Sequence, residues 1–209
     1  MSQRILYMVL FLSSQVWAAQ SSDYFNASYG RQLPGSSDKV GLWWASSGWK
    51  ISRDKPLPEE KSQAIVITTA RNEAEAAQLV VRPATPLKAL TILAGELAGP
   101  GGAAIGAGNV EVLEVRYVNV EQPTDKSSSP GLWPDPLPPL KGPIDLEANK
   151  NQPFWVRVKA PRDVPAGTYK GSLSLQGQDY SADVPLSVEV YDFVLPARMT
   201  CTTAFGISP

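Results

Sequence analysis

The sequence predicts an all-β fold, an antiparallel β-sandwich of two sheets. Several runs alternate between apolar and polar residues with a period of two, which is the spacing of a strand with one buried face. Short turns rich in glycine and proline separate these runs, and the 209 residues include 16 Gly and 19 Pro. About eight to ten short strands joined by such turns are typical of a sandwich.

The first half of the chain contains several predicted strands. Residues 64–69, 78–82 and 88–93 are rich in β-forming side chains. Between the first two runs, "ARNEAEAA" at 70–77 is too short for a secure helix, so we expect a strand or a bulge there. Along residues 110–121 the apolar positions change phase, which predicts either one long bulged strand or two strands that meet at a corner.

The clearest elements lie near the end of the chain. Residues 154–159 alternate, and so do residues 169–176 and 180–190, which flank a Gly177-Gln178 turn and form a predicted hairpin. A shift of one residue would move its whole apolar row into water, so the register is well determined. Pro185 has no N–H for a strand ladder, which predicts an edge position or a bulge.

The composition excludes several classes of site. The chain has 19 basic and 20 acidic side chains, so no excess of positive charge suits nucleic acid. It has no histidine, which rules out histidine-activated nucleophiles and histidine-based metal sites. We expect no metal and no cofactor, because neither a phosphate-binding glycine loop nor a metal-ligand spacing is present. Cys201 is the single cysteine and cannot form an intramolecular disulfide.

The N-terminus has the features of a secretory signal peptide. A basic start, an apolar run at 5–12 and small residues up to Ala18 follow in the order that such peptides show. We expect residues 1–18 to be removed on export to the periplasm or the extracellular space, and residues 19–39 to form an N-terminal extension. No other stretch is long and apolar enough to span a membrane.

Two tryptophan motifs contain the candidate contact residues. Trp43 and Trp44 are adjacent in "GLWWASSGWK", so on a strand they face opposite ways, and one needs a cover other than the core. A tryptophan outside the core suits a sugar platform or a partner domain.

The second motif, "SPGLWPDPLPPL" at 129–140, contains Trp133 and Asp135. Its five prolines predict a rigid loop rather than a loose linker. Three roles are open: Trp133 caps the core of the sandwich, contacts another domain, or stacks on a sugar whose hydroxyl hydrogen-bonds to Asp135.

The carboxylates do not single out a catalytic pair. Hydrolysis of a glycoside usually needs two carboxyl groups about 5–9.5 Å apart. The candidates lie mostly at strand ends and turns, where a solvated charge is the ordinary state; they are Glu73, Glu75, Asp135, Asp145, Glu147 and Asp163.

Five stretches, from "WWASSGWKISRDKPLP" to "VPLSVEVYDFVLPARMTCTTAFGIS", resemble the N-terminal domain of glycoside hydrolase family 123 and its relatives. The most specific segments are 70–73, 133–137, 165–169 and 193–196, and the resemblance covers roughly residue 40 to the C-terminus. It implies a β-sandwich that precedes a TIM-type barrel, in exported proteins that act on glycans. Residues 40–197 would be the sandwich, and residues 198–209 the first strand of a barrel that is otherwise missing.

The resemblance also implies a function. The known activity of the family is β-N-acetylgalactosaminidase, and its catalytic Asp-Glu pair lies in the barrel. This chain has no Asp-Glu dipeptide, so we expect no catalytic residue in it and no activity of the chain alone. We expect a non-catalytic accessory domain whose Trp133 loop packs against a following barrel or lines its cleft. The alternative is a self-sufficient glycan-binding module that uses exposed tryptophans.

Overall fold

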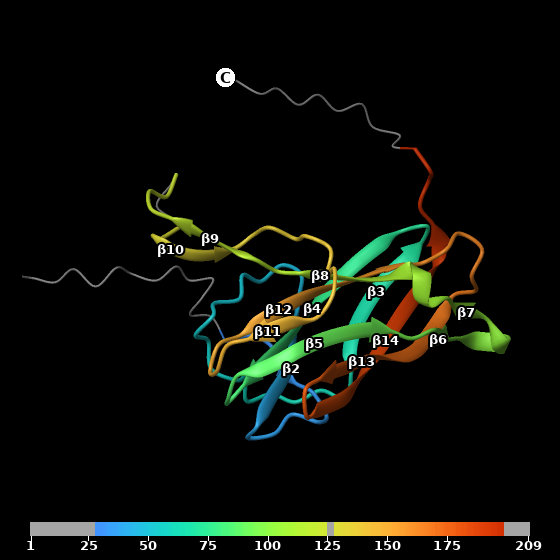
Figure 1. Cartoon of the computed structure of the whole chain (residues 1–209). Helices are drawn as coiled ribbons and strands as arrows, with labels where there is room; N and C mark the ends of the chain where they lie inside the picture. Colours follow the sequence, from blue (N-terminus) through green and yellow to red (C-terminus); the bar gives the residue numbers. More distant parts are fainter. Residues whose placement is uncertain (1–27, 125–127, 199–209) are drawn as a thin grey trace, which may run out of the picture.

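Two β-sheets pack face to face around a large apolar core in the computed structural model, which describes residues 28–124 and 128–198 (Figure 1). The predicted all-β sandwich is therefore confirmed. The predicted signal peptide at 1–18 lies outside the described residues, as does nearly all of the barrel strand predicted at 198–209. No helix in the described part of the chain is long and apolar enough to cross a membrane.

The first sheet has five antiparallel strands in the order β1-β2-β4-β12-β8. Their bounds are Arg31–Gln32 for β1, Val40–Ser46 for β2, Ala74–Pro83 for β4, Gln152–Lys159 for β12 and Val110–Glu114 for β8. The long central strands β4 and β12 pair over their whole overlap, from Gln152 opposite Val81 to Lys159 opposite Ala74.

The second sheet has the order β11-β5-β13-β14-β3, and two short strands, β6 and β7, extend it beside β13. The bounds are Ile144–Leu146 for β11, Leu87–Ala94 for β5, Gly167–Gly177 for β13, Tyr180–Val194 for β14, Ile65–Arg71 for β3, Leu97–Ala98 for β6 and Ala104–Ile105 for β7. Short 3₁₀ turns at Pro100–Gly102 and Ala107–Asn109 connect β6, β7 and β8. The β13–β14 pair is the predicted hairpin with the predicted apolar row facing inward, but Gly177 pairs with Tyr180, so the turn residues are Gln178 and Asp179 rather than Gly177 and Gln178.

The edge strand β3 runs parallel to β14, which differs from the antiparallel pairing that the sequence predicts. The reason is that β3 does not turn back within its own sheet but continues through Asn72 and Glu73 into β4 of the other sheet. Residues 70–77 are therefore strand, turn and strand. Pairing of β14 with β3 starts at Leu186, so Pro185 lies beside β13 only, and its predicted edge position is confirmed.

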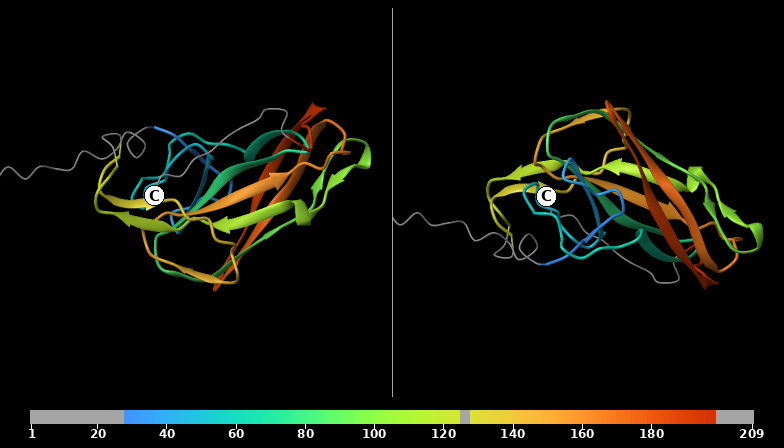
Figure 2. Two further views of the ribbon diagram at one scale, coloured as in Figure 1. Left: turned by 90° about the horizontal axis from the view of Figure 1, so that it is seen from above. Right: turned by 90° about the horizontal axis from the view of Figure 1, so that it is seen from below.

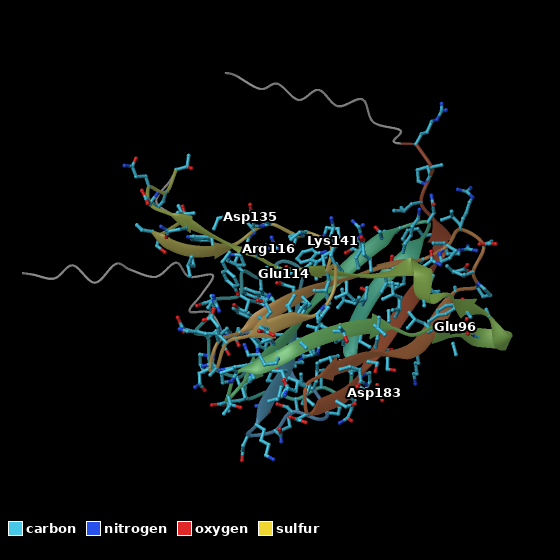
Figure 3. All side chains as sticks on the ribbon, in the orientation of Figure 1. Glu96, Glu114, Arg116, Asp135, Lys141 and Asp183 are labelled. Carbon is cyan, nitrogen blue, oxygen red and sulfur yellow. The ribbon has the colours of Figure 1, made fainter. Side chains whose placement is uncertain are left out.

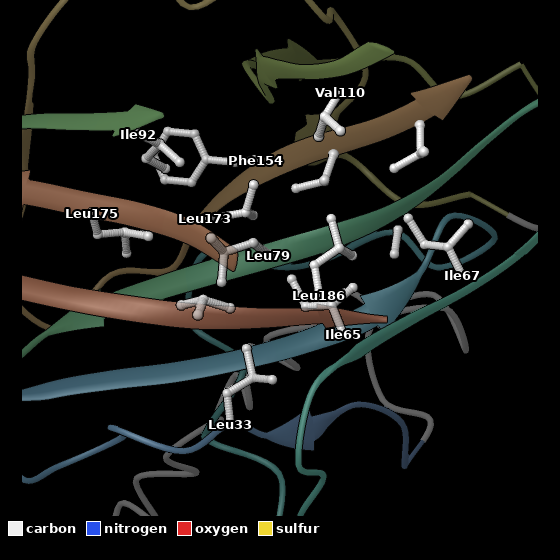
Figure 4. Packing of buried hydrophobic residues seen from close by; sticks show 14 of the residues in the cluster. Leu33, Ile65, Ile67, Leu79, Ile92, Val110, Phe154, Leu173, Leu175 and Leu186 are labelled. Carbon is white, nitrogen blue, oxygen red and sulfur yellow. The ribbon is translucent and has the colours of Figure 1, made fainter. Parts of the chain in front are cut away.

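The core lies between the two sheets because each strand directs alternate apolar side chains inward. Leu79 and Phe154 from the five-stranded sheet meet Leu173, Leu186 and Ile65 from the other sheet (Figure 4). All five are essentially inaccessible to solvent. Each such side chain stabilises the fold by about 1.5–3 kcal/mol relative to an exposed position. The hydrophobic effect therefore determines the register of these strands.

The outer face of the five-stranded sheet carries a second, smaller buried cluster. Trp43 and Val80 belong to it together with Tyr29 and Ile51, and Trp49 and Leu57 pack against it. The segment 47–62, which we call the covering segment, supplies three of these residues and lies over the sheet. The part of this face over β2 and the middle of β4 is therefore shielded from water, whereas the outer face of the β13–β14 hairpin is polar.

The phase change at 110–121 marks the end of one strand and the start of another. β8 ends at Glu114, and β9, Tyr117–Val120, leaves the sandwich to pair with β10, Gly131–Pro134. We call this two-stranded hairpin the ribbon. In Figure 1 it projects beyond the sheets, so the prediction of two strands is confirmed rather than that of one bulged strand.

Candidate functional site

Trp133 lies on the ribbon and not in the core of the sandwich. It pairs with Val118 across the two strands and belongs to neither buried cluster. Its indole Nε1 donates a hydrogen bond to the carbonyl oxygen of Ser129 at 2.7 Å, which holds the half-buried ring against its own loop. Val118 and Leu132 are 41% and 48% exposed. The role as a cap on the core is thereby excluded, and contact with a domain or a ligand remains.

The base of the ribbon is fastened to the covering segment. The hydroxyl of Tyr117 donates to the carbonyl oxygen of Ile51 at 2.9 Å, and burial raises the pKa of this phenol above its ordinary value. The ammonium of Lys50 donates to the carbonyl oxygen of Pro134 at 3.2 Å and lies 3.5 Å from Asp135 Oδ1. Asp135 is therefore paired with a cation at the surface. The ribbon has a defined attachment although a two-stranded hairpin alone is only marginally stable.

The prolines after Trp133 form an edge that resists further pairing. The carbonyl oxygens of Pro136 and Pro138 accept hydrogen bonds from the N–H groups of Arg116 and Glu114, at 2.9 and 3.0 Å. Asp135 donates its own N–H to the carbonyl oxygen of Arg116 at 3.1 Å. Figure 3 shows Glu114, Arg116 and Asp135 on this side of the molecule. The segment thus runs beside β8, and of residues 134–139 only Leu137 retains an N–H that these bonds do not use.

The two adjacent tryptophans lie in different environments. Trp43 is 0% exposed, and its Nε1 donates to Asn151 Oδ1 at 3.4 Å. Its selection as a contact residue is therefore corrected: it is a core residue of the second cluster, because the covering segment lies over that face of β2. Trp44 is half-buried, packs against the main core and lines a cavity beside β1.

The candidate carboxylates do not converge. Asp145 Oδ2 lies 2.7 Å from Lys88 Nζ, Glu147 lies 3.0 Å from Arg53 Nη2, and Asp135 is paired with Lys50. Glu73 Oε2 accepts the backbone N–H of Ala70 at 2.7 Å. Each of these groups therefore serves a local ion pair or turn. In the described ranges, no three metal-ligating side chains gather into a possible metal site.

The Glu73 turn anchors the point where the chain leaves the sandwich. Asn72 has a left-handed φ of 66°, and its Nδ2 donates to the carbonyl oxygen of Leu195 at 2.9 Å. The Leu195 N–H donates to the carbonyl oxygen of Arg71, also at 2.9 Å, and Arg71 Nη2 lies 3.0 Å from Asp192 Oδ1. Two backbone bonds between Asn72, Glu73 and Ala160 fix the turn from the other side. We call residues 70–73 and 192–195 the exit clamp.

Two aromatic residues lie exposed beside the exit clamp. Tyr191 and Phe193 at the end of β14 are 45% and 52% exposed, and their rings stack with centroids 6.1 Å apart and planes at 11°. Val66 on the neighbouring strand β3 is also exposed. Tyr191 and Phe193 form what we call the exit face. Large apolar side chains that gather at the surface often mark an interaction site.

The ribbon and the C-terminal end of β14 both lie toward the top of the view in Figure 1. In Figure 1 the ribbon rises at the upper left and β14 ends at the upper right. Figure 2 shows that they lie at opposite ends of the long dimension of the sheets.

A family model for the glycoside hydrolase 123 N-terminal domain matches residues 44–177. The chain belongs to this family. Among solved structures, a family 123 glycoside hydrolase from Clostridium perfringens is similar with a TM-score of 0.65 and 18% identity, over 75% of this chain and 28% of that one. At this identity the likeness shows the fold alone, and the chain spans well under half the length of that hydrolase.

Two further structures are more distant. A PapD-like domain of human CEP192 has a TM-score of 0.39 and 14% identity, over 75% of this chain and 88% of that one. The CooA pilin subunit of enterotoxigenic Escherichia coli has a TM-score of 0.34 and 14% identity, over 76% of this chain and 99% of that one. A comparison with curated proteins found no match.

Sequence reasoning missed the exit face and the aromatic wall of the cavity beside β1. Tyr191 and Phe193 continue the β14 alternation on its polar face, and two large aromatic rings at outward positions were the available signal. Tyr29 precedes every predicted strand, so nothing in the local pattern indicated that it stacks on Trp49.

Proposed function

We propose that this chain is a non-catalytic accessory domain of an exported glycoside-hydrolase-like protein, and that it docks to a catalytic domain that follows it in the polypeptide. The observation that carries the proposal is the exit face: two stacked, exposed aromatic rings directly beside the anchored point where the chain leaves the sandwich.

The exit clamp supports a fixed placement of the next domain. A linker without hydrogen bonds would allow the two domains to rotate freely, whereas Leu195 is bonded through both its N–H and its carbonyl oxygen. Whatever follows Pro196 therefore starts from a defined position. The exit face lies on the last strand before that position, so a following domain covers it with little loss of chain entropy.

The ribbon offers a second contact for the same domain. It projects toward the top of Figure 1, where β14 also ends, and Val118, Leu132 and the half-buried Trp133 give it apolar surface. Two contacts, at the ribbon and at the exit face, would limit rotation of the following domain relative to the sandwich better than a contact at the exit face alone. The proposal keeps the role predicted for Trp133: it packs against the following domain or forms one wall of that domain's cleft.

The chemistry is assigned to the following domain. Of the candidate carboxylates, Asp135, Asp145 and Glu147 are each paired with a cation, and Glu73 accepts a backbone hydrogen bond within its own turn. By resemblance to the family, the substrate class is β-N-acetylgalactosaminides. Export by the N-terminal signal is part of the proposal and is testable by N-terminal sequencing of the secreted protein.

Hydrogen–deuterium exchange tests the docking. The chain is compared with the product extended through the coding sequence that follows Pro209. We expect slower exchange at 191–195 and in the ribbon of the longer product, and a loss of that protection in a Tyr191→Ser, Phe193→Ser double variant. Leu93→Ser, at a 66% exposed position of the same sheet, is the matched control. Equal exchange in both products, or no effect of the double variant, would contradict the proposal.

A further inference from the structure

A cavity of about 750 Å³ lies beside β1, at the edge of the five-stranded sheet. Residues 28–31 form one wall and residues 55–60 the other, and Trp44, Ser46 and Trp49 line it between them. Its volume is within the range of about 300–1,000 Å³ that small-ligand sites occupy. It shares no residue with the exit face or the ribbon, so the docking proposal does not use it.

One wall of the cavity is aromatic and held rigidly. The rings of Tyr29 and Trp49 stack with centroids 4.4 Å apart and planes at 4°. Lys55 Nζ lies 4.0 Å from the centre of the Tyr29 ring. The Trp49 carbonyl oxygen accepts a hydrogen bond from the buried Gln78 amide at 2.8 Å, which fixes the loop that carries the indole. Tyr29 is itself buried between Trp49 and the Lys55 ammonium, so the aromatic surface that faces the cavity is the half-buried ring of Trp49. A rigid aromatic surface of this kind binds the apolar face of a ligand with little loss of conformational entropy.

The charged groups of the cavity balance. Arg31 and Lys55 are cationic, Glu59 and Glu60 are anionic, and all four line the cavity. Arg31 Nε and Glu60 Oε2 form an ion pair at 3.1 Å, which consumes one charge of each sign. A site selective for a charged ligand would present an excess of the opposite sign. These groups therefore favour an uncharged ligand that accepts and donates hydrogen bonds.

A buried donor at the cavity adds an independent indication. Trp44 lines the cavity, and its Nε1–H is buried and has no hydrogen-bond partner within the described part of the chain. A buried donor without a partner costs about 1–3 kcal/mol. An acceptor from a ligand or from bound water would remove this cost.

We propose that this cavity binds an uncharged carbohydrate. A sugar has an apolar C–H face for the ring of Trp49 and hydroxyls for the carboxylates of Glu59 and Glu60. It needs no net charge in the site. The assignment gives the domain a binding activity of its own in addition to docking.

Isothermal titration calorimetry of the signal-cleaved chain tests the assignment. The probes are neutral trisaccharides of galactose, glucose and N-acetylglucosamine, with trigalacturonate and the deacetylated glucosamine trimer as charged analogues. Ser46→Trp fills the cavity from an exposed position and removes no core side chain. Thr168→Trp, at an exposed position of β13 outside the cavity, is the control.

We expect at least one neutral trisaccharide to bind, Ser46→Trp to weaken that binding about tenfold or more, and Thr168→Trp to leave it unchanged. Near-ultraviolet circular dichroism checks that both variants are folded. The proposal is overturned if no neutral probe binds, if a charged analogue binds more tightly than its neutral counterpart, or if Ser46→Trp binds as the parent does. None of these outcomes affects the exchange experiment on the exit face, so the two proposals fail separately.

Discussion

Asn151 shows how single residues hold the covering segment to the sheet. It is 0% exposed, its Nδ2 donates to the carbonyl oxygens of Ser52 and Lys55 at 2.9 and 2.8 Å, and its Oδ1 accepts from Trp43. A sequence reader sees only an asparagine in a polar run before a strand. The structure makes it, together with the buried Gln78, a polar anchor between the covering segment and the sheet.

Asn151→Leu is therefore expected to destabilise the fold by about 2–4 kcal/mol, because the change leaves a buried indole N–H and two carbonyl oxygens without their partner. Urea denaturation followed by tryptophan fluorescence measures the free energy of unfolding. Asn119→Leu on the exposed ribbon is the control and should change it little. A small effect at Asn151 would show that water replaces its hydrogen bonds.

Ala89 is held in an unfavourable backbone conformation. Its φ is 53°, in the left-handed region, within β5. Ala89→Gly should stabilise the protein by about 0.5–1 kcal/mol, since glycine removes the Cβ strain, and this gain exceeds its entropic cost. Ala94→Gly, at an ordinary strand position, should destabilise it. The comparison uses the midpoints of chemical denaturation, and equal signs for the two substitutions would refute the explanation.

Asp145 binds the backbone at the left-handed Ala89 position. Hydrogen bonds from Lys88 Nζ and from the Ala89 N–H hold the pKa of Asp145 below its ordinary value. Because the folded pKa is depressed, the stabilisation is present above the ordinary carboxyl pKa and is lost as the pH falls through the folded value. Lys88→Met should raise the pKa of Asp145. Carboxyl-carbon NMR titration measures it, and an unchanged pKa would contradict the assignment.

At the scale of elements, the proline segment 134–139 covers the β8 edge of the five-stranded sheet and limits its pairing with further strands. Residues 134–139 pair with β8 largely through carbonyl oxygens and present few N–H groups to another strand. Native sheets use proline at edges in this way to prevent pairing between molecules. The rigid loop that the sequence predicts is therefore a protective border strand as well as the support of Trp133.

Replacing Pro136, Pro138 and Pro139 together by alanine should have two effects. Stability should fall by about 0.4–1 kcal/mol per site, because the unfolded chain gains freedom. Aggregation on mild heating should become faster, because Pro139, whose nitrogen faces away from β8, regains an outward N–H beside that of Leu137. Light scattering measures the second effect, with Pro86→Ala in an exposed loop as the control. Unchanged aggregation would remove the protective role.

The elements that sequence could predict are those whose neighbours are local. The β13–β14 hairpin follows from alternation and a glycine turn, and Pro185 follows from its missing N–H. The parallel β3–β14 pair could not be predicted, because it depends on which sheet edge β3 reaches after the Asn72 turn. Trp43 and Trp44 were separated correctly by parity, but only the covering segment decides which of them is buried. The cavity depends on Tyr29, which contacts Trp49 through the fold.

At the scale of the whole molecule, the domain has three surfaces with different roles. The outer face of the five-stranded sheet is closed by the covering segment, beside which the sugar-sized cavity lies. The polar face of the β13–β14 hairpin meets solvent. At the C-terminal end of β14, Tyr191 and Phe193 form the exposed exit face, which we propose as the contact for a following domain.

The most direct test of our central proposal, that the chemistry lies in a following domain, is an assay of the purified chain with a chromogenic β-N-acetylgalactosaminide. The account predicts no hydrolysis above the rate in buffer. Hydrolysis that follows the chain through purification and is abolished by Asp135→Asn or Glu147→Gln would contradict it, because it would place the catalytic carboxylates in this domain.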